Sequence, residues 1–264
     1  MNRKLGLNAD CLSGVDQRHT LELIADTGFQ SYFTTTCKKD LFWPIKQKGD
    51  ALGLTCEFLH APTDGVNTMW SAGDSYQKID SAMREAIDTA ADCEVPAVIL
   101  HISSGWNAPR IHDIGLARFD ALVEYAANRG VRILFENLRM IGNVAYFTDH
   151  YRNAENVGFC LDCGHEHCFT KTVSWLDIFR ERTAATHIHD NFGGTDPNQP
   201  ADLHLLPFDG TYDYAAMMKK LDRYGYEGVL MLEVYNTSLP SYRQLSETAF
   251  VKTAFDRITE ISKM

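Results

Sequence analysis

Residues 157–162 read VGFCLD, and residues 132–137 read RILFEN. Each is a short, nearly continuous apolar run that reaches an acidic residue at or near its end. Strands that are covered on both faces, as in a parallel sheet flanked by helices, have this composition. Two similar runs are AVILH at 97–101 and GVLMLE at 228–233. The pattern predicts an α/β protein whose strands end in ionisable side chains.

Eight such runs alternate with longer amphipathic segments along the chain. The predicted strands are Leu5–Asp10, Gln30–Thr36, Leu54–Pro62, Ala97–Ser103, Arg132–Asn137, Val157–His165, Ala184–Asn191 and Gly228–Val234. Predicted helices include Gln77–Cys93, Ile114–Asn128, Tyr214–Tyr224 and Arg243–Ser262, and the segments after the second and fifth strands look short. This alternation predicts a single-domain (β/α)8 TIM barrel over residues 1–264, with a doubly wound open sheet as the main alternative.

Composition limits the classes of partner and compartment. The formal net charge of −10 argues against nucleic acid or an anionic membrane as the default partner, although a local basic rim would still allow nucleic acid. Seven scattered cysteines predict free thiols, and the single CxxC of Cys160 and Cys163 is interpreted as buried strand cysteines. No apolar leader or membrane-length segment is present, so we expect a cytoplasmic protein. A homo-oligomer is compatible with the fold, but no motif specifies one.

Ionisable residues gather where the predicted strands end. In a barrel these carboxyl ends meet at one mouth, where barrel enzymes place their chemistry. Each residue alone has an ordinary structural explanation, but buried carboxylates and imidazoles are costly together unless they are paired or bind metal. The residues at strand ends are His60, His101, Glu136, Asp162, His165, His187, His189 and Glu233, and Asp202 and His204 follow in the loop after the seventh strand.

A mixed carboxylate and imidazole site suits Zn²⁺, Mn²⁺, Co²⁺ or Fe²⁺. The expected core of the site is formed by Glu136, Asp162, His187 and Glu233. Because His187 and His189 are two residues apart on a strand, both can face the same side. We expect His187 to be the ligand and His189 to support a ligand or contact the substrate.

With these residues in view, the chain resembles the xylose isomerase-like TIM barrel superfamily over nearly its whole length. That group includes sugar-phosphate isomerases and epimerases, ketose 3-epimerases, inosose-processing enzymes and endonuclease IV. The resemblance to the epimerases implies one divalent ion on the four core residues and a carbohydrate substrate. It also implies that Glu136 and Glu233 exchange protons with the substrate through a metal-stabilised enediolate, and that His165 contacts a substrate oxygen. Trp106 is a candidate apolar face for the sugar, or else packs within its loop.

The chain is also similar to endonuclease IV, which holds three zinc ions and hydrolyses phosphodiesters. That likeness adds up to two further ions, on ligands drawn from His60, His101, His165, Asp202 and His204. The segments HIHDN (187–191) and DLHLLPFDG (202–210) instead resemble isomerase-like barrels. We therefore expect a metal-dependent sugar isomerase or epimerase, with an endonuclease IV-like hydrolase as the alternative.

Overall fold

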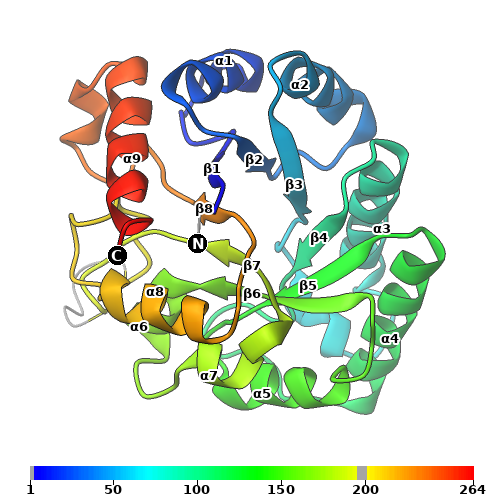
Figure 1. Cartoon of the computed structure of the whole chain (residues 1–264). Coiled ribbons are helices and arrows are strands. Elements are labelled where there is room, and N and C mark those ends of the chain that lie inside the picture. The colour runs from blue at the N-terminus through cyan, green and yellow to red at the C-terminus, as the bar shows by residue number, and fades with distance from the viewer. Residues whose placement is uncertain (1–2, 195–200) are drawn as a thin grey trace.

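The computed structural model describes residues 3–194 and 201–264. Eight parallel strands form a ring in the order β7-β6-β5-β4-β3-β2-β1-β8, and helices surround it (Figure 1). The strands are β1 (Leu5–Asn8), β2 (Ser31–Thr34), β3 (Thr55–His60), β4 (Ala97–Leu100), β5 (Arg132–Glu136), β6 (Val157–Asp162), β7 (Thr183–His187) and β8 (Leu230–Leu232). The predicted TIM barrel is confirmed, and the open sheet is wrong. That one domain extends over all of residues 1–264 stays a prediction.

The ring closes between β7 and β8 with the help of a side chain. Just beyond β7, the Ile188 amide donates to the Met231 carbonyl at 2.8 Å, and the Glu233 amide donates to the Ile188 carbonyl at 3.1 Å. Nearer the start of the strands, the Thr186 hydroxyl donates to the Val229 carbonyl and accepts from the Met231 amide. The Thr186 side chain therefore replaces part of the backbone hydrogen bonding between β7 and β8, and the barrel is nearly closed.

The helices cover the outside of the strand ring. They are α1 (Gln17–Thr27), α2 (Lys39–Ala51), α3 (Gln77–Asp92), α4 (Asp113–Asn128), α5 (Ile141–His150), α6 (Cys163–Phe169), α7 (Trp175–Phe179), α8 (Tyr214–Arg223) and α9 (Glu247–Ile261). The larger apolar core lies between strands and helices. A smaller one, with Phe33, Phe58 and Met231, fills the barrel interior. Burial of these apolar faces is the main stabilising term for the fold.

Several predicted boundaries need correction. Strand β6 stops at Asp162 and not at His165, because the Asp162 carboxylate accepts the His165 amide at 2.6 Å and so caps α6. The prediction that Cys163 lies in a strand is therefore wrong, because it begins a helix. All seven cysteines are free and buried. The helix expected from Arg243 begins at Glu247, where Ser246 caps it. Helix α2 is longer than its sequence suggested and continues through Pro44, its sixth residue.

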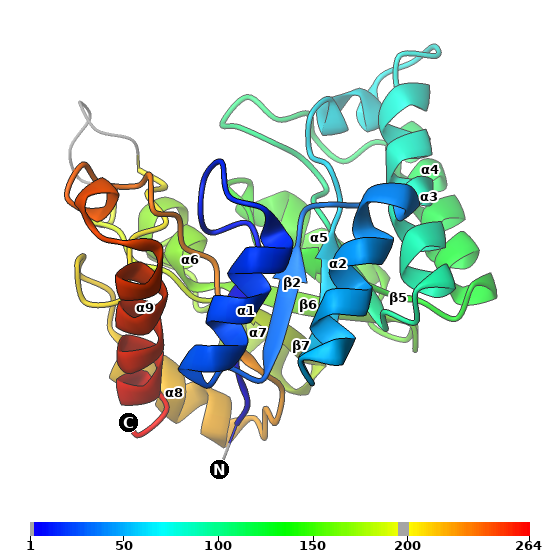
Figure 2. The same ribbon diagram turned by 90° about the horizontal axis from the view of Figure 1, so that it is seen from above.

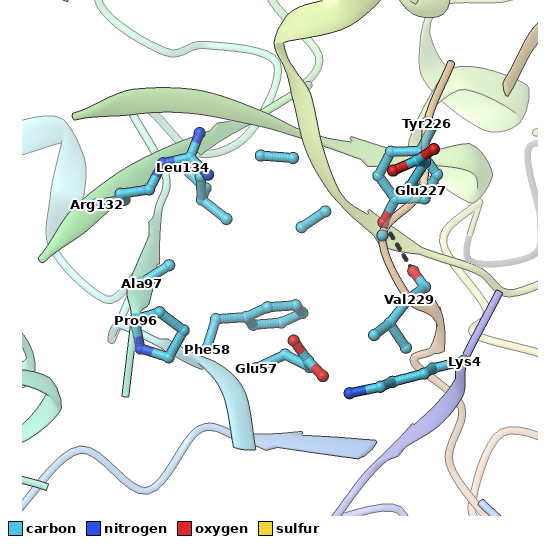
Figure 3. A pocket seen from close by; sticks show the side chains of 13 residues that line it. Lys4, Glu57, Phe58, Pro96, Ala97, Arg132, Leu134, Tyr226, Glu227 and Val229 are labelled. Carbon is cyan, nitrogen blue, oxygen red and sulfur yellow. Dashed lines mark hydrogen bonds between the residues drawn. The ribbon is translucent and has the colours of Figure 1, made fainter. Parts of the chain in front are cut away.

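The two ends of the barrel differ in chemistry. The loops that follow the strands gather at the end opposite the chain termini (Figure 2). At the end of the barrel that holds the chain termini, a cavity of about 410 Å³ is lined by Ala97 and Arg132, which start β4 and β5, and by Phe58 from within β3 (Figure 3). Phe58 also contacts the His187 ring, so apolar side chains separate this cavity from the opposite mouth. No helix among the described residues is long and apolar enough to span a membrane.

Candidate metal centre

Four strands deliver the predicted core ligands to one point. Glu136 and Asp162 end β5 and β6, His187 ends β7, and Glu233 follows β8. His187 Nδ1 lies 3.2 Å from Glu233 Oε2, 3.5 Å from Glu136 Oε2 and 3.9 Å from Asp162 Oδ2. All four side chains are buried. The neighbouring registers explain the convergence, since Asp162 pairs with His187 across β6 and β7.

Apolar rings form the floor of this centre. Phe33 stacks on the His187 ring with centroids 4.9 Å apart, and Phe58 contacts the same ring at 5.6 Å. Such a floor excludes water from below and strengthens electrostatic interactions among the groups above it. Among the described residues, these rings close the centre on the side of the barrel interior, and the loops after the strands surround its other side.

Two histidines lie on the β3 and β4 side of Glu136. His60 Nε2 is 3.3 Å and His101 Nε2 is 3.1 Å from Glu136 Oε2. The Nδ1 atom of His60 lies 3.0 Å from the Ala61 carbonyl, which suits an N–H donated to that oxygen. Donation from Nδ1 fixes the tautomer and leaves Nε2 directed at the carboxylate.

His165 occupies the β5 and β6 side. Its Nδ1 lies 3.0 Å from both the Asn137 carbonyl and Glu136 Oε1, and its Nε2 lies 3.0 Å from Asp202 Oδ2. His204 follows the same rule, with Nδ1 at 3.1 Å from the Glu233 carbonyl and Nε2 at 3.4 Å from Asp202 Oδ1. Both imidazoles are thus held by backbone carbonyls with the other nitrogen facing a carboxylate.

The position of Asp162 depends on two neighbours. Asn137 exchanges two hydrogen bonds with the Asp162 backbone, accepting from the amide at 2.7 Å and donating to the carbonyl at 2.8 Å. His189 Nε2 lies 3.1 and 3.2 Å from the two Asp162 carboxylate oxygens, and its ring stacks on His204 at 4.0 Å. His189 therefore supports a predicted ligand.

The long loop after β7 folds back over the mouth. Asp190 and Leu205 exchange two backbone hydrogen bonds of 2.9 Å. The Asp190 carboxylate also accepts the amides of Phe208 and Tyr212 at 2.9 and 3.1 Å. These bonds fix the returning chain and bring Asp202 and His204, which lie in a loop and not at the end of a strand, into the cluster.

The donor set fits a divalent cation. His187 Nε2 is buried and lacks a hydrogen-bond partner among the described residues, whereas His187 Nδ1 and Asp202 Oδ1 have neighbours at ion-pair distance but none in hydrogen-bonding geometry. Buried polar atoms without partners are costly, and a metal ion would satisfy them. Further triads with ligand atoms within 4.8 Å of one another include His60, His101 and Glu136, and also His189, Asp202 and His204. The mouth therefore has donors for more than one ion.

Nearby carboxylates raise the pKa of His60 and His204 when no ion is bound, whereas burial lowers the pKa of His101. Burial lowers the pKa of His60, but the Glu136 carboxylate outweighs it and raises the pKa to about 9. Burial opposes protonation of His204 as well, yet Glu233 and Asp202 raise its pKa to about 10. Burial raises the pKa of Glu136, and the imidazoles of His101 and His187 hold it well below its usual value. Metal binding must therefore displace protons.

Trp106 lies outside the cluster, at the edge of the mouth. Its side chain is 60% exposed, and its ring meets the Phe169 ring edge-on at 5.6 Å. Together with Arg139 these residues line an open pocket of about 570 Å³ that reaches Asp202. The sequence did not single out Phe169 or Asn137, nor Tyr235, whose hydroxyl lies 3.4 Å from Glu233 Oε1. Of these three residues, only Asn137 could have been found from the sequence, because it directly follows Glu136.

Fold and cluster together define a parallel-strand barrel with a carboxylate–imidazole centre at the carboxyl ends of its strands. Residues 14–254 match the family described as the xylose isomerase-like TIM barrel, and the chain belongs to this family.

The chain has curated relatives at moderate identity. It is 31% identical over 185 residues to the uncharacterized protein y4fM of Sinorhizobium fredii, covering 65% of this chain and 56% of that protein. It is 24% identical over 194 residues to the uncharacterized protein MJ1311 of Methanocaldococcus jannaschii, covering 67% and 64%. The matches thus span less than two thirds of either relative.

Solved structures with the same fold cover almost the full length. A D-tagatose 3-epimerase-like protein superposes with a TM-score of 0.75 at 18% identity, covering 98% of both chains. An L-ribulose 3-epimerase gives 0.76 at 16% identity, covering 99% of this chain and 95% of its own. A 3-keto-D-glucoside 4-epimerase from E. coli gives 0.75 at 14%, covering 100% of both. At these identities the likeness shows the fold.

Proposed function

We propose that the protein is a divalent-metal-dependent isomerase or epimerase that acts on a sugar or a related polyol. The observation that carries the proposal is the convergence of Glu136 and Glu233, from two different strands, on one atom, His187 Nδ1, at 3.5 and 3.2 Å. The epimerase titles of the solved structures with this fold support the same reaction class. The expected substrate is a small carbohydrate.

Glu136, Asp162, His187 and Glu233 would hold one Zn²⁺, Mn²⁺, Co²⁺ or Fe²⁺ ion. When bound, the ion would act as a Lewis acid on adjacent carbonyl and hydroxyl oxygens of the substrate. One of the two glutamates takes a proton from the carbon beside the carbonyl, and the other returns a proton to the substrate from the opposite side. His165 donates a hydrogen bond to a substrate oxygen, and His189 keeps Asp162 in place.

Solvent-isotope exchange tests the proposal. The ion-loaded protein should move deuterium from D₂O into the carbon-bound position of a substrate ketose, and E233Q should abolish this exchange while remaining folded. E227Q is a matched control, since Glu227 lies at the other end of the same strand and is exposed. Exchange by E233Q at the wild-type rate would refute the assignment of Glu233.

A second candidate is phosphodiester hydrolysis with two or three ions. It is favoured by His60, His165 and His204, each of which has Nδ1 at a backbone carbonyl and Nε2 at a carboxylate. In this case His101 is essential, whereas a one-ion isomerase loses little when it is replaced. H101A should therefore retain isotope exchange under the first proposal and lose cleavage of abasic-site DNA under the second.

We further propose a reducing, cytoplasmic location, which the seven free and buried cysteines support.

A further inference from the structure

The pocket beside the candidate centre has a cationic wall that the proposed reaction does not use. It is formed by the loop after β4 with Trp106, the loop after β5 with Arg139, the end of α6 with Phe169, and the returning loop with Asp202. Asp202 also contacts His165 in the centre, at 3.0 Å. The pocket therefore adjoins the candidate centre through Asp202.

The Arg139 guanidinium is held there by an aromatic ring and not by a carboxylate. Its central carbon lies 3.8 Å from the Phe169 ring centroid, a cation–π contact. Across residues 3–194 and 201–264, no hydrogen bond or ion pair engages this side chain. Other arginines of this acidic chain are paired with aspartates, among them Arg84, Arg129 and Arg257. Among the described residues, Arg139 therefore lines the pocket with no hydrogen-bond or ion-pair partner.

The pocket wall that carries Trp106 is held in place by hydrogen bonds within the protein. Asn67, in the 3-10 helix after β3, accepts the Ser104 amide at 2.9 Å and donates to the Ser104 carbonyl at 2.8 Å. This clamp anchors the loop that carries Trp106, whose exposed ring also contacts Phe169 and offers an apolar face to the pocket. An exposed tryptophan beside an unpaired arginine suits a ligand that is apolar on one face and anionic at one end.

We infer that Arg139 binds an anionic group, a phosphate or a carboxylate, at the end of the substrate that is remote from the reacting carbons. The guanidinium presents a planar pair of donors that matches either anion. The inference deepens the proposed function and rests on it for the reacting part of the substrate. It defines the substrate class as a phosphorylated ketose or a keto-sugar acid, with Phe169 as the positioning residue for Arg139.

Equilibrium binding of three matched ligands tests the inference. D-Fructose, D-fructose 6-phosphate and D-fructuronate are titrated calorimetrically into Mn²⁺-loaded wild type, R139A, R139K and R152A. Arg152 is the matched control because it is an exposed arginine paired with Asp149. At least one anionic ligand should bind the wild type and R152A about tenfold or more tightly than fructose, as one charge-assisted hydrogen-bonded pair provides.

R139A should bind all three ligands equally, and R139K should keep part of the difference. The tighter of the two anionic ligands identifies phosphate or carboxylate as the preferred group. Equal affinities in the wild type, absence of binding by all three, or an unchanged difference in R139A overturns the inference. Failure of the proposed reaction is separable, since isotope exchange would then be absent while Arg139 still discriminates the anions.

Discussion

A methyl group at Gly164 should loosen the candidate metal centre through His189. Gly164 lies in the first turn of α6, and a Cβ built there would come 1.9 Å from His189 Cε1 and 2.4 Å from both ring nitrogens. The ring cannot yield easily, because it is fully buried and stacks on His204 at 4.0 Å. Overpacking of this kind costs about 1–3 kcal/mol.

The functional effect follows from what His189 holds. Its Nε2 lies at hydrogen-bonding distance from both oxygens of Asp162. Loss of a group that orients a metal ligand typically weakens binding by about 10–100-fold. We therefore expect G164A to bind Mn²⁺ about 10–100-fold more weakly in a calorimetric titration and to unfold at lower urea concentration.

Two controls isolate the cause. G142A places a methyl on α5 where nothing lies within 4 Å, so its metal affinity should equal that of the wild type. In an H189A background the ring is absent, and G164A should then cost little further stability. A G164A protein with wild-type Mn²⁺ affinity would refute the reasoning. An undiminished cost in the H189A background would assign the effect to α6 itself.

Four further outcomes are expected. E233Q should abolish isotope exchange and leave the free energy of unfolding within about 1 kcal/mol of the wild-type value; full activity would remove Glu233 from the site. N137A should lower the free energy of unfolding in urea by about 1–3 kcal/mol, since it leaves the buried Asp162 backbone groups unpaired; an unchanged midpoint would contradict this. Removal of the ion with a chelator should lower the Tm, and re-addition of Mn²⁺ at 100 times its Kd should raise the free energy of unfolding by about 2.7 kcal/mol; a Tm insensitive to chelator would count against a resident ion. The hydrogen bond from Tyr224, together with Lys220, lowers the pKa of Asp177 to about 2, so this group adds stability above pH ~4 that is lost as the pH falls towards 2; D177N should flatten the pH dependence of stability in that window, and an equally steep dependence would contradict the assignment.

The barrel was predictable because buried parallel strands have a simple signature. Runs such as RILFE and VGFCLD are apolar on both faces, and the polar residue at each end marks the mouth. The boundaries were less accessible, as at Asp162, where the same carboxylate ends a strand and caps a helix. Whether the strand continues or a helix begins depends on the hydrogen bond from the His165 amide to the Asp162 carboxylate, which hydrophobic periodicity does not predict.

The members of the cluster could be predicted, but their relations could not. Strand ends bring Glu136 and His187 together in any barrel of this register. His165 Nδ1 lies beside Glu136 and the Asn137 carbonyl, and its Nε2 lies beside Asp202, an arrangement made only in the folded chain. Phe169 likewise acquires meaning only when α6 and the loop after β5 meet at the pocket.

The most direct test of the account is the number and position of bound metal ions. Crystals grown with Mn²⁺ should show one anomalous-scattering peak, ligated by Glu136, Asp162, His187 and Glu233, and solution analysis should give one ion per chain. Peaks at His60 and His101 or at Asp202 and His204 in addition would contradict the one-ion isomerase and favour the hydrolase. Absence of any ion from the four core residues would contradict the metal centre itself.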